Sequence, residues 1–331
     1  MTFTQKTLGG AVALAIGASA CLAEPALMYD LGGKFDKSFN EAAYNGAQRW
    51  AEETGNSYRE IEVTAEAQRV QFATRLAEAG FNPVVVLGFQ NAATLEEVAP
   101  KYPDTSFVLV DMVVDLPNVR SVIFQEHEGS YLVGMLAAMA TESDTVGFIG
   151  GMDVPLIRHF GCGYAQGAKA VNPDITVIAN MTGTTPAAWN DPVKGGELTK
   201  AQISQGADVI YAAAGGTGVG VLQAAADADV LSIGVDSNQN HLHPGQVLTS
   251  MIKRVDNAVF NAFSDGAGLE TGIVSMGLPD DGVGYALDEH NAPLISDEMK
   301  AAVDNAREKI IAGEIQVVSY YENDSCPAHD F

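Results

Sequence analysis

Three aspartates in this 331-residue sequence stand directly after short apolar runs, namely Asp30, Asp111 and Asp236. Apolar runs of this kind are typical of strands that are buried on both faces of a parallel sheet. Ligands of such sheets bind beyond the carboxyl ends of the strands, where these three side chains would lie. A carboxylate there can accept two hydroxyl hydrogen bonds, as the diol of a ribose requires. For any single aspartate, a helix N-cap or a solvated turn is the alternative.

An aromatic residue and an amide, Phe39 and Asn40, follow the first of these aspartates. Ser38, with Glu41 three residues later, has the pattern of a capping box, so Phe39 and Asn40 are expected in the first turn of a helix. An aromatic ring beside an amide suits a flat ligand that forms hydrogen bonds, such as a nucleobase. The alternative is that Phe39 packs in the core and that Asn40 is a surface residue.

Trp189 and Lys253 are two further side chains at positions where a ligand could reach them. Trp189 stands in the segment 187–192, whose turn-forming residues argue against deep burial, and an exposed indole favours a stacking partner. Trp50, in contrast, falls within a helical pattern and is expected in the core. Lys253 follows the apolar run 247–251 and precedes a helical pattern. It is either an ion-pair partner of the aspartates or a donor to sugar oxygens, and both interpretations place it at the ligand.

Apolar runs alternate with helical patterns along the whole chain, which predicts repeated βα units. The predicted strands are 26–29, 58–63, 83–87, 106–110, 119–124, 145–149, 175–181, 209–213, 231–235 and 247–251. The predicted helices are 40–53, 67–79, 91–99, 129–141, 157–170, 194–205, 218–228, 255–266 and 296–313. This order predicts an α/β protein of two doubly wound, Rossmann-like lobes joined by crossovers, with helix 129–141 as the first passage between them.

Acidic side chains outnumber basic ones by 42 to 18, which gives a formal net charge of -24. A nucleic acid would be repelled at long range, so it is excluded as a partner reached by general electrostatics. Hydrophobic residues make up 47% of the chain and charged residues 18%. This is the composition of a packed globular protein and not of a disordered acidic segment.

The first 23 residues have the pattern of a cleaved secretory signal, with a basic start, an uncharged apolar run and small residues before the expected cleavage after Ala23. An earlier cut that leaves Cys21 as a lipid-anchored first residue is the alternative. Beyond residue 23 the sequence has Cys162, in a predicted glycine-flanked turn, and Cys326 near the end of the chain. In an oxidising compartment we expect them to form a disulfide, and two buried free thiols are the alternative.

Several segments of the sequence occur in the order typical of one known family. These segments are Asp30–Asn40, Gly88–Phe89, Val110–Asp111, Glu128–Gly134, Val146–Met152, Gly163–Ala168, Trp189–Gly195, Gly206–Ile210, Gly215–Gly218 and Ile233–Asp236. Together they resemble the basic-membrane-protein family of ABC-transporter substrate-binding lipoproteins, whose characterised members are purine-nucleoside receptors. The order of all these segments is far more specific than any one of them.

The resemblance implies the type I periplasmic-binding-protein fold, with a ligand in the cleft between two lobes. It assigns the ribose contacts to Asp111, Gly216, Asp236 and Lys253, and the polar contacts to the base to Asp30 and Asn40. It places the base between Phe39 and Trp189, and at the second of these positions the nucleoside receptors have Phe. The implied ligand is a nucleoside, with a purine favoured, and another small hydroxylated ligand such as a pentose is the alternative.

As a member of such a family, the chain would be a monomer in the periplasm that delivers its ligand to the permease and ATPase subunits of an importer. We expect its N-terminal lobe to comprise residues 24–143 and about 251–285. The second lobe would comprise residues 144–250 and about 286–331.

An enzymatic function is the competing class. Gly215–Gly220 lies between a predicted strand and a predicted helix, but it lacks the G-x-G-x-x-G spacing of a dinucleotide site. The sequence has no Gly-x-Ser-x-Gly or His-Glu-x-x-His motif, and His241 and His243 flank a turn without a third metal ligand nearby. An exported nucleoside hydrolase is the less favoured alternative. The sequence therefore predicts no catalytic residues, no metal and no cofactor.

Overall fold

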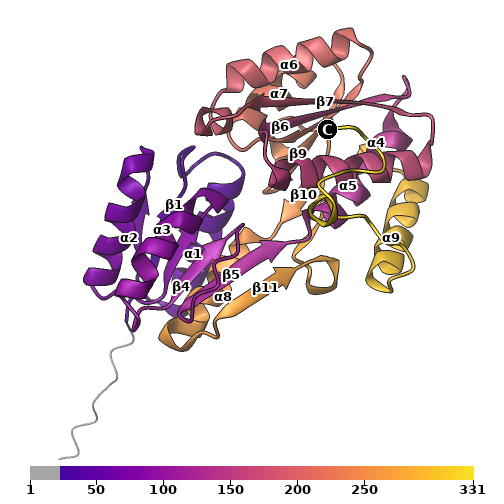
Figure 1. Cartoon of the computed structure of the whole chain (residues 1–331). Helices are drawn as coiled ribbons and strands as arrows, with labels where there is room; N and C mark the ends of the chain where they lie inside the picture. The colour runs from indigo at the N-terminus through magenta and orange to yellow at the C-terminus, as the bar shows by residue number, and fades with distance from the viewer. Residues whose placement is uncertain (1–22) are drawn as a thin grey trace, which may run out of the picture.

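The computed structural model describes residues 23–331, which form two lobes, each built on a six-stranded sheet (Figure 1). The predicted signal segment up to residue 22, including Cys21, lies outside the described residues. The first sheet has the strand order β11-β5-β4-β3-β1-β2, and the second has the order β12-β10-β9-β8-β6-β7. Neighbouring strands are parallel, except that β12 runs antiparallel to β10.

The strands of the first sheet are β1 (Ala26–Tyr29), β2 (Arg59–Glu62), β3 (Val84–Leu87), β4 (Phe107–Val110), β5 (Val119–Phe124) and β11 (Gly272–Met276). Those of the second sheet are β6 (Thr145–Met152), β7 (Thr176–Gly183), β8 (Val209–Ala213), β9 (Leu231–Asp236), β10 (Val247–Lys253) and β12 (Val283–Tyr285). The helices are α1 (Phe39–Thr54), α2 (Arg69–Glu78), α3 (Ala92–Val98), α4 (Glu126–Ala140), α5 (Pro155–Val171), α6 (Pro192–Ser204), α7 (Thr217–Asp227), α8 (Val255–Asp265) and α9 (Asp297–Ile311). In residues 23–331, no helix combines the length and the apolar character that a membrane span needs.

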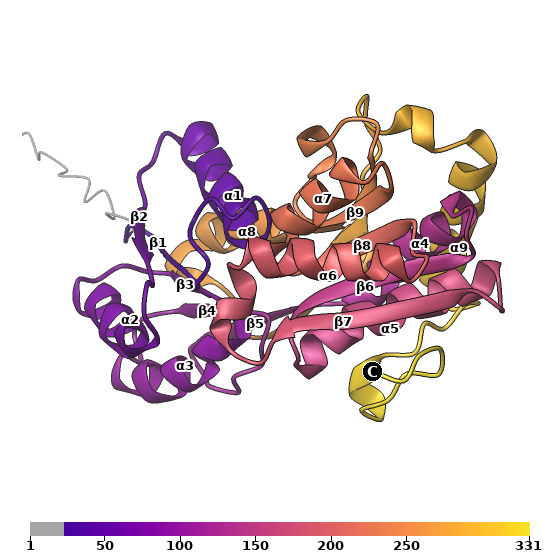
Figure 2. The same ribbon diagram turned by 90° about the horizontal axis from the view of Figure 1, so that it is seen from above.

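Both faces of the first sheet are buried at its central strands β1, β3 and β4, as the continuous apolar runs predict. In β1, Leu27 and Tyr29 pack into one hydrophobic cluster, whereas Ala26 and Met28 pack into another on the opposite face. All four residues are fully inaccessible to solvent. Because successive side chains of a strand point to opposite faces, helices must cover both sides of such a sheet. Figure 2 shows them arranged in this way around the strands.

The predicted α/β architecture of two doubly wound lobes is confirmed, and each predicted strand and helix is present within a few residues of its expected bounds. The strands β11 and β12 were not predicted from the sequence. Four of the five residues of β11 are exposed at the edge of the first sheet, so that strand does not have the pattern of a buried one. β12 has only three residues, which is too short for a periodic signal.

Within the described residues the chain passes between the two sheets three times. It leaves β5 for α4 at Gln125, returns from β10 to α8 at Arg254, and passes again between β11 and β12. The amide of Gln125 donates to Met276 O (2.9 Å), and the amide of Arg254 donates to Gly282 O (2.9 Å). The crossing segments are therefore tied to one another. In Figure 1, α8 and β11 consequently lie beside the early strands of the chain, although they come late in the sequence.

The first crossing precedes α4, whereas the predicted lobe boundary at residue 143 assigned this helix to the N-terminal lobe. The reason is the close packing of α4 on α5. A Cβ atom added at Gly134 would overlap the carbonyl group of Tyr164, and one added at Gly163 would overlap the backbone of His127. Glycines at these positions let the two backbones touch, so α4 belongs with α5 in the second lobe.

The predicted disulfide between Cys162 and Cys326 is confirmed, with a Cα–Cα distance of 5.5 Å. Cys162 lies within helix α5, as the predicted helix 157–170 implies, and the glycine-flanked turn predicted around it is wrong. The C-terminal segment that carries Cys326 runs along this helix. Gln166 exchanges two hydrogen bonds of 2.9 Å with the backbone of Val318. The guanidinium of Arg158 donates to the carbonyl of Phe331 at 3.1 Å. The end of the chain is thus part of the second lobe.

We expect Gly134→Ala to lower the free energy of unfolding by about 1–3 kcal/mol or more, because the new methyl group meets backbone and not a flexible side chain. The matched control is Gly196→Ala in α6, where the nearest backbone atom would lie 3.4 Å from the new Cβ. There alanine should stabilise the helix by up to about 1 kcal/mol. Denaturant unfolding followed by circular dichroism measures both values, and equal effects would contradict the close packing of α4 on α5.

Candidate functional site

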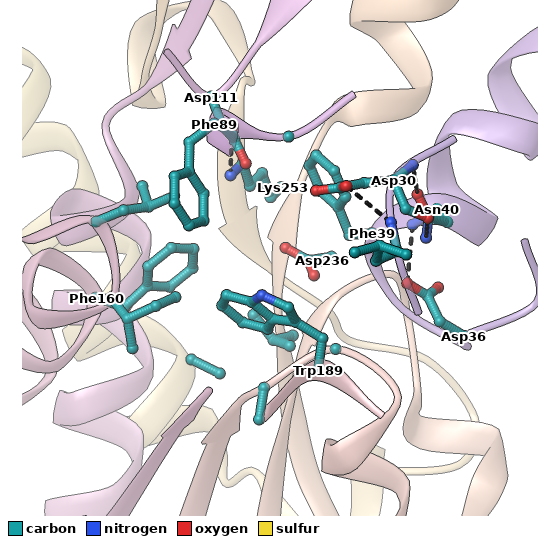
Figure 3. A pocket seen from close by; sticks show the side chains of 18 residues that line it. Asp30, Asp36, Phe39, Asn40, Phe89, Asp111, Phe160, Trp189, Asp236 and Lys253 are labelled. Carbon is teal, nitrogen blue, oxygen red and sulfur yellow. Dashed lines mark hydrogen bonds and ion pairs between the residues drawn. The ribbon is translucent and has the colours of Figure 1, made fainter. Parts of the chain in front are cut away.

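A cavity lies between the two lobes, where the carboxyl ends of both sheets face each other (Figure 3). We call it the inner cavity. Its empty space is about 600 Å³, including the part that is open to solvent. Of the eight predicted ligand residues, the following line it: Asp30, Phe39, Asn40, Asp111, Trp189, Asp236 and Lys253. In place of the eighth, Gly216, the neighbouring Gly215 lines the cavity.

The ammonium group of Lys253 is the centre of a buried ion network at the end of the inner cavity nearest the crossings. Its Nζ lies 2.7 Å from Asp111 Oδ1 and 3.0 Å from Glu126 Oε1. The side chain of Lys253 is only 2% exposed. Asp111 follows β4 in the first lobe, whereas Lys253 ends β10 and Glu126 begins α4 in the second. The network therefore joins the two lobes.

Three aromatic rings surround the same ammonium group. The Nζ of Lys253 lies 5.3 Å from the ring centre of Phe39, 5.0 Å from that of Phe124 and 5.4 Å from that of Phe160. Each ring offers the negative face of its π-system to the cation, and such interactions are stronger where water is excluded. The rings thus hold the charge in place and keep its surroundings apolar.

Burial disfavours the charged forms of the acids around Lys253. It raises the pKa of Asp111 and of Asp236 to about 6, although the nearby ammonium lowers both values. Burial also raises the pKa of Glu126. Burial acts to lower the pKa of Lys253, but the three carboxylates outweigh it, so that the lysine pKa is raised above its ordinary value. At neutral pH this end of the inner cavity carries more negative than positive charge.

Asp30 forms an ion pair with Arg69, a residue that was not predicted from the sequence to lie at the site. Its Oδ1 lies 2.7 Å from Nη1 of Arg69 and accepts a hydrogen bond from the amide of Leu31 at 2.8 Å. Burial raises the pKa of Asp30, and Arg69 opposes that shift. The other carboxylate oxygen lies over Gly88, where any Cβ atom would overlap it. This leaves Oδ2 as the oxygen of Asp30 that can meet a ligand.

The amide of Asn40 binds the loop between β1 and α1. Its Oδ1 accepts from the backbone amide of Asp30 at 3.1 Å. Its Nδ2 donates to the carbonyl of Asp30 at 3.2 Å and to that of Gly33 at 3.1 Å. Both amide hydrogens are thereby used, and one lone pair of Oδ1 remains for a ligand. Asn40 therefore holds this loop in place at the cavity wall, in addition to its predicted contact with a base.

The predicted capping box of Ser38 and Glu41 is wrong, because Asp36 caps α1. The Asp36 carboxylate accepts hydrogen bonds from the amides of Ser38, Asn40 and Glu41 at 2.9–3.1 Å. The Ser38 hydroxyl instead donates to Asp236 of the second lobe. Burial raises the pKa of Asp36 to about 7, against the three amides that lower it.

Further hydrogen bonds close the two lobes over the inner cavity beside this serine. The Ser237 hydroxyl donates to the carbonyl of Ser38 at 2.8 Å. The side-chain amide of Gln239 donates to the carbonyl of Lys37 at 2.9 Å. Ser237 and Gln239 follow β9, and Lys37 and Ser38 precede α1. The structure therefore represents a closed arrangement of the lobes.

Aromatic side chains from both lobes line the inner cavity. Phe39 and Phe89 come from the first lobe, and Phe160 and Trp189 come from the second (Figure 3). Phe39 and Trp189 were predicted, whereas Phe89 and Phe160 were not. Phe160 lies within helix α5, so no strand-end position marks it in the sequence. Phe89 does follow a strand end, because it comes directly after Gly88 at the end of β3, and that position could have revealed it. A flat apolar ligand would meet rings from either side.

The Trp189 indole is positioned by its own lobe. The ring packs over Gly151 at the end of β6, where a Cβ atom would overlap it. The Thr217 hydroxyl donates to the carbonyl of Ala188 and accepts from the amide of Asp191, each at 2.7 Å. These contacts fix the short segment that carries the tryptophan. The indole is therefore preorganised, which lowers the entropic cost of stacking a ligand on it.

Residues 24–320 match the family Bmp, described as ABC transporter substrate-binding protein PnrA-like. The chain is 34% identical to the ABC transporter nucleoside-binding protein BmpA of Lactococcus lactis, over 89% of this chain and 88% of that protein. It is 33% identical to a CD4+ T-cell-stimulating antigen of Listeria innocua, over 88% of this chain and 87% of that one.

Among solved structures, the chain is similar to a solute-binding protein of an ABC transporter system from Aeropyrum pernix. The two superpose with a TM-score of 0.81 and 29% sequence identity, over 91% of this chain and 95% of the other. The predicted type I periplasmic-binding-protein fold is thereby confirmed.

We expect Lys253→Met to lower the free energy of unfolding by about 3–5 kcal/mol at pH 8, because it leaves buried carboxylates without a countercharge. The loss should shrink at pH 5. The pKa values of Asp111 and Asp236 are already about 6 beside the lysine, and they rise further without it. An acid whose pKa is higher in the folded state takes up protons on folding, so acidification relieves the defect.

The control for this variant is Lys300→Met, which removes an exposed lysine paired with Asp304. It should change stability by less than about 1 kcal/mol at either pH. Denaturant unfolding at the two pH values gives the comparison. A loss for Lys253→Met that is the same at pH 5 and pH 8 would show that the buried carboxylates are not its cause.

Proposed function

Because the chain belongs to the Bmp family of PnrA-like ABC transporter substrate-binding proteins, we propose that its ligand is a nucleoside, with a purine nucleoside favoured. The observation that carries this proposal is the composition of one cavity. Rings from opposite lobes, Phe39 and Trp189, line it together with the carboxylates of Asp111 and Asp236 and the ammonium of Lys253. Aromatic rings suit a base, and charged hydrogen-bonding groups suit a ribose.

In this proposal the base lies between Phe39 and Trp189, and its polar edge meets Asp30 and Asn40. The ribose lies toward the crossings, where the carboxylates accept hydrogen bonds from its hydroxyl groups. The Lys253 ammonium donates to ribose oxygens, and the backbone amide of Gly216, next to the cavity-lining Gly215, is the second donor. The excess of carboxylates favours an uncharged nucleoside over a nucleotide, because a phosphate would meet like charge.

The proposed working cycle is that of a receptor in the periplasm. An open form captures the ligand on the first lobe, and closure brings Trp189 and Asp236 over it. The closed monomer then docks on the permease of an importer that is driven by ATPase subunits. In this scheme the predicted signal segment directs export, and a lipid anchor at Cys21 is the alternative to a free protein.

Two alternatives have specific tests. A pentose could use the same carboxylates and could stack on Trp189, and in that case free ribose would bind as well as a nucleoside does. A nucleoside hydrolase would release free base from inosine or guanosine. The family is described as substrate-binding proteins, and the relative from Lactococcus lactis is named a nucleoside-binding protein, which favours binding without turnover.

We expect Trp189→Ala to weaken nucleoside binding by about 1–3 kcal/mol, the range for a base stacked on an aromatic side chain. Trp189→Phe is the matched control, since it keeps a ring at the same position and should retain most of the affinity. Isothermal titration calorimetry with inosine, guanosine and adenosine measures both variants. An unchanged affinity for Trp189→Ala would show that the base does not lie on this indole.

We expect Asp236→Ala to weaken nucleoside binding by about 1.5–3 kcal/mol, the range for hydrogen bonds to a charged group. The affinity for free bases should scarcely change, because they lack the ribose. Calorimetry with each nucleoside and its free base tests the assignment, and equal losses of affinity for both would contradict a ribose contact.

The affinity of the wild-type protein for nucleosides should fall below pH 6, where the carboxylates of Asp111 and Asp236 take up protons. Calorimetry above and below pH 6 measures this fall.

A further inference from the structure

A second compartment adjoins the inner cavity at Leu31, which lines both spaces. The second one, which we call the outer compartment, is bounded by the first lobe at Glu62 and Thr64 and by the second lobe at Ala187 and Asn190. Its empty space is about 750 Å³, including the part that is open to solvent. It is therefore at least as roomy as the inner cavity itself.

The strand orders place the outer compartment at the end of the cleft farthest from the crossings. In the first sheet, β4 with Asp111 is next to the crossing strand β5, whereas β2 with Glu62 is the opposite edge. In the second sheet, β10 with Lys253 lies on the crossing side, whereas β7, which leads to Ala187, is the opposite edge. The Lys253 network and the outer compartment thus lie at opposite ends of the cleft.

Gly32 lines the outer compartment and is next to Leu31, which lines both spaces. Its φ of 121° is one that residues with a side chain rarely adopt. A Cβ atom built there would lie 3.8 Å from Nδ2 of Asn40 and 4.0 Å from Cβ of Trp189. Gly32 therefore borders the position proposed for the base. Because it has no side chain, the space that a Cβ atom would occupy between Asn40 and Trp189 stays free.

The chemistry of the walls restricts what can enter. Leu31, Val63 and Ala187 offer apolar surface, and Asn190 offers an amide. The carboxylate of Glu62 accepts a hydrogen bond from the amide of Lys34 at 3.1 Å and brings negative charge to the rim. The chain as a whole carries a net charge of -24. An uncharged alkyl or aryl group suits these walls, whereas an anionic group would be repelled.

We propose that the protein binds purine nucleosides that carry a bulky uncharged substituent on the six-membered ring, with that substituent in the outer compartment. The proposal rests on the proposed function, because it uses the same orientation of the ligand. With the ribose held near Lys253, the edge of the six-membered ring is the part of a purine farthest from the ribose. That edge points along the cleft to Gly32, so a group attached there continues into the outer compartment.

The experiment compares N6-benzyladenosine, O6-benzylinosine and N2-benzylguanosine, each with its unsubstituted parent, by isothermal titration calorimetry on the full mature chain. For at least one parent that binds, the benzyl derivative should bind within about threefold of it or more tightly. Loss of binding of all three derivatives, with binding of a parent retained, would overturn this proposal and leave the proposed function intact. If neither parents nor derivatives bind, both proposals fail.

Ala187→Trp tests the location of the substituent, because an indole at this exposed position would fill the outer compartment from its rim. It should weaken the benzyl derivative about tenfold or more and leave the parent within about threefold. The matched control is Ala301→Trp, at an exposed position on α9, which should change neither affinity. An unchanged affinity of the derivative for Ala187→Trp would overturn the placement in the outer compartment.

Discussion

The interaction on which the site depends is the burial of the Lys253 ammonium among carboxylates. Removing an ion from water costs several kcal/mol, and the cost is recovered only when opposite charges meet it in good geometry. Here Asp111 comes from one lobe and Glu126 from the first residue of the other, while Lys253 itself ends the strand that leads into the second crossing. A single cation thus sets the charge of the inner cavity and also links the segments by which the lobes are joined. The shape of the cleft and its electrostatics cannot be changed independently.

The two ends of the cleft differ because both sheets are ordered in the same sense from the crossings outward. Asp111 and Lys253 lie at strands near the crossings, whereas the outer compartment lies between the segments that follow the edge strands β2 and β7. A ligand with one hydroxylated end and one flat end has a single favourable orientation in such a cleft. Glu126, which pairs with Lys253, also contacts a histidine of its own lobe. Its second carboxylate oxygen, Oε2, lies 3.7 Å from Nε2 of His159. Burial lowers the pKa of that histidine to about 3, so the ring is neutral and adds no charge.

Strand ends could be predicted from the sequence, because parallel strands buried on both faces have continuous apolar runs that stop at a polar residue. This is why Asp30, Asp111 and Asp236 were found. Glu126, Arg69 and Phe160 were not, since each lies on a helix and reaches the site only through tertiary packing. The same limit explains the errors at Ser38 and at α4. Asp36 and Ser38 are both good capping residues, and only the approach of Asp236 decides between them. The assignment of α4 depends on glycines that let it touch α5, a contact that only tertiary packing creates.

The disulfide has a topological consequence for a lobe that is made of two separate stretches of chain. Cys162 and Cys326 are separated by 164 residues, and the covalent loop that they close contains α8 and β11, which belong to the first lobe. The second and third crossings both lie inside this loop. A single backbone cut at either one would therefore leave one covalently connected molecule for as long as the bridge stays oxidised. The bridge therefore keeps the two lobes covalently connected even after a cut at one of these crossings.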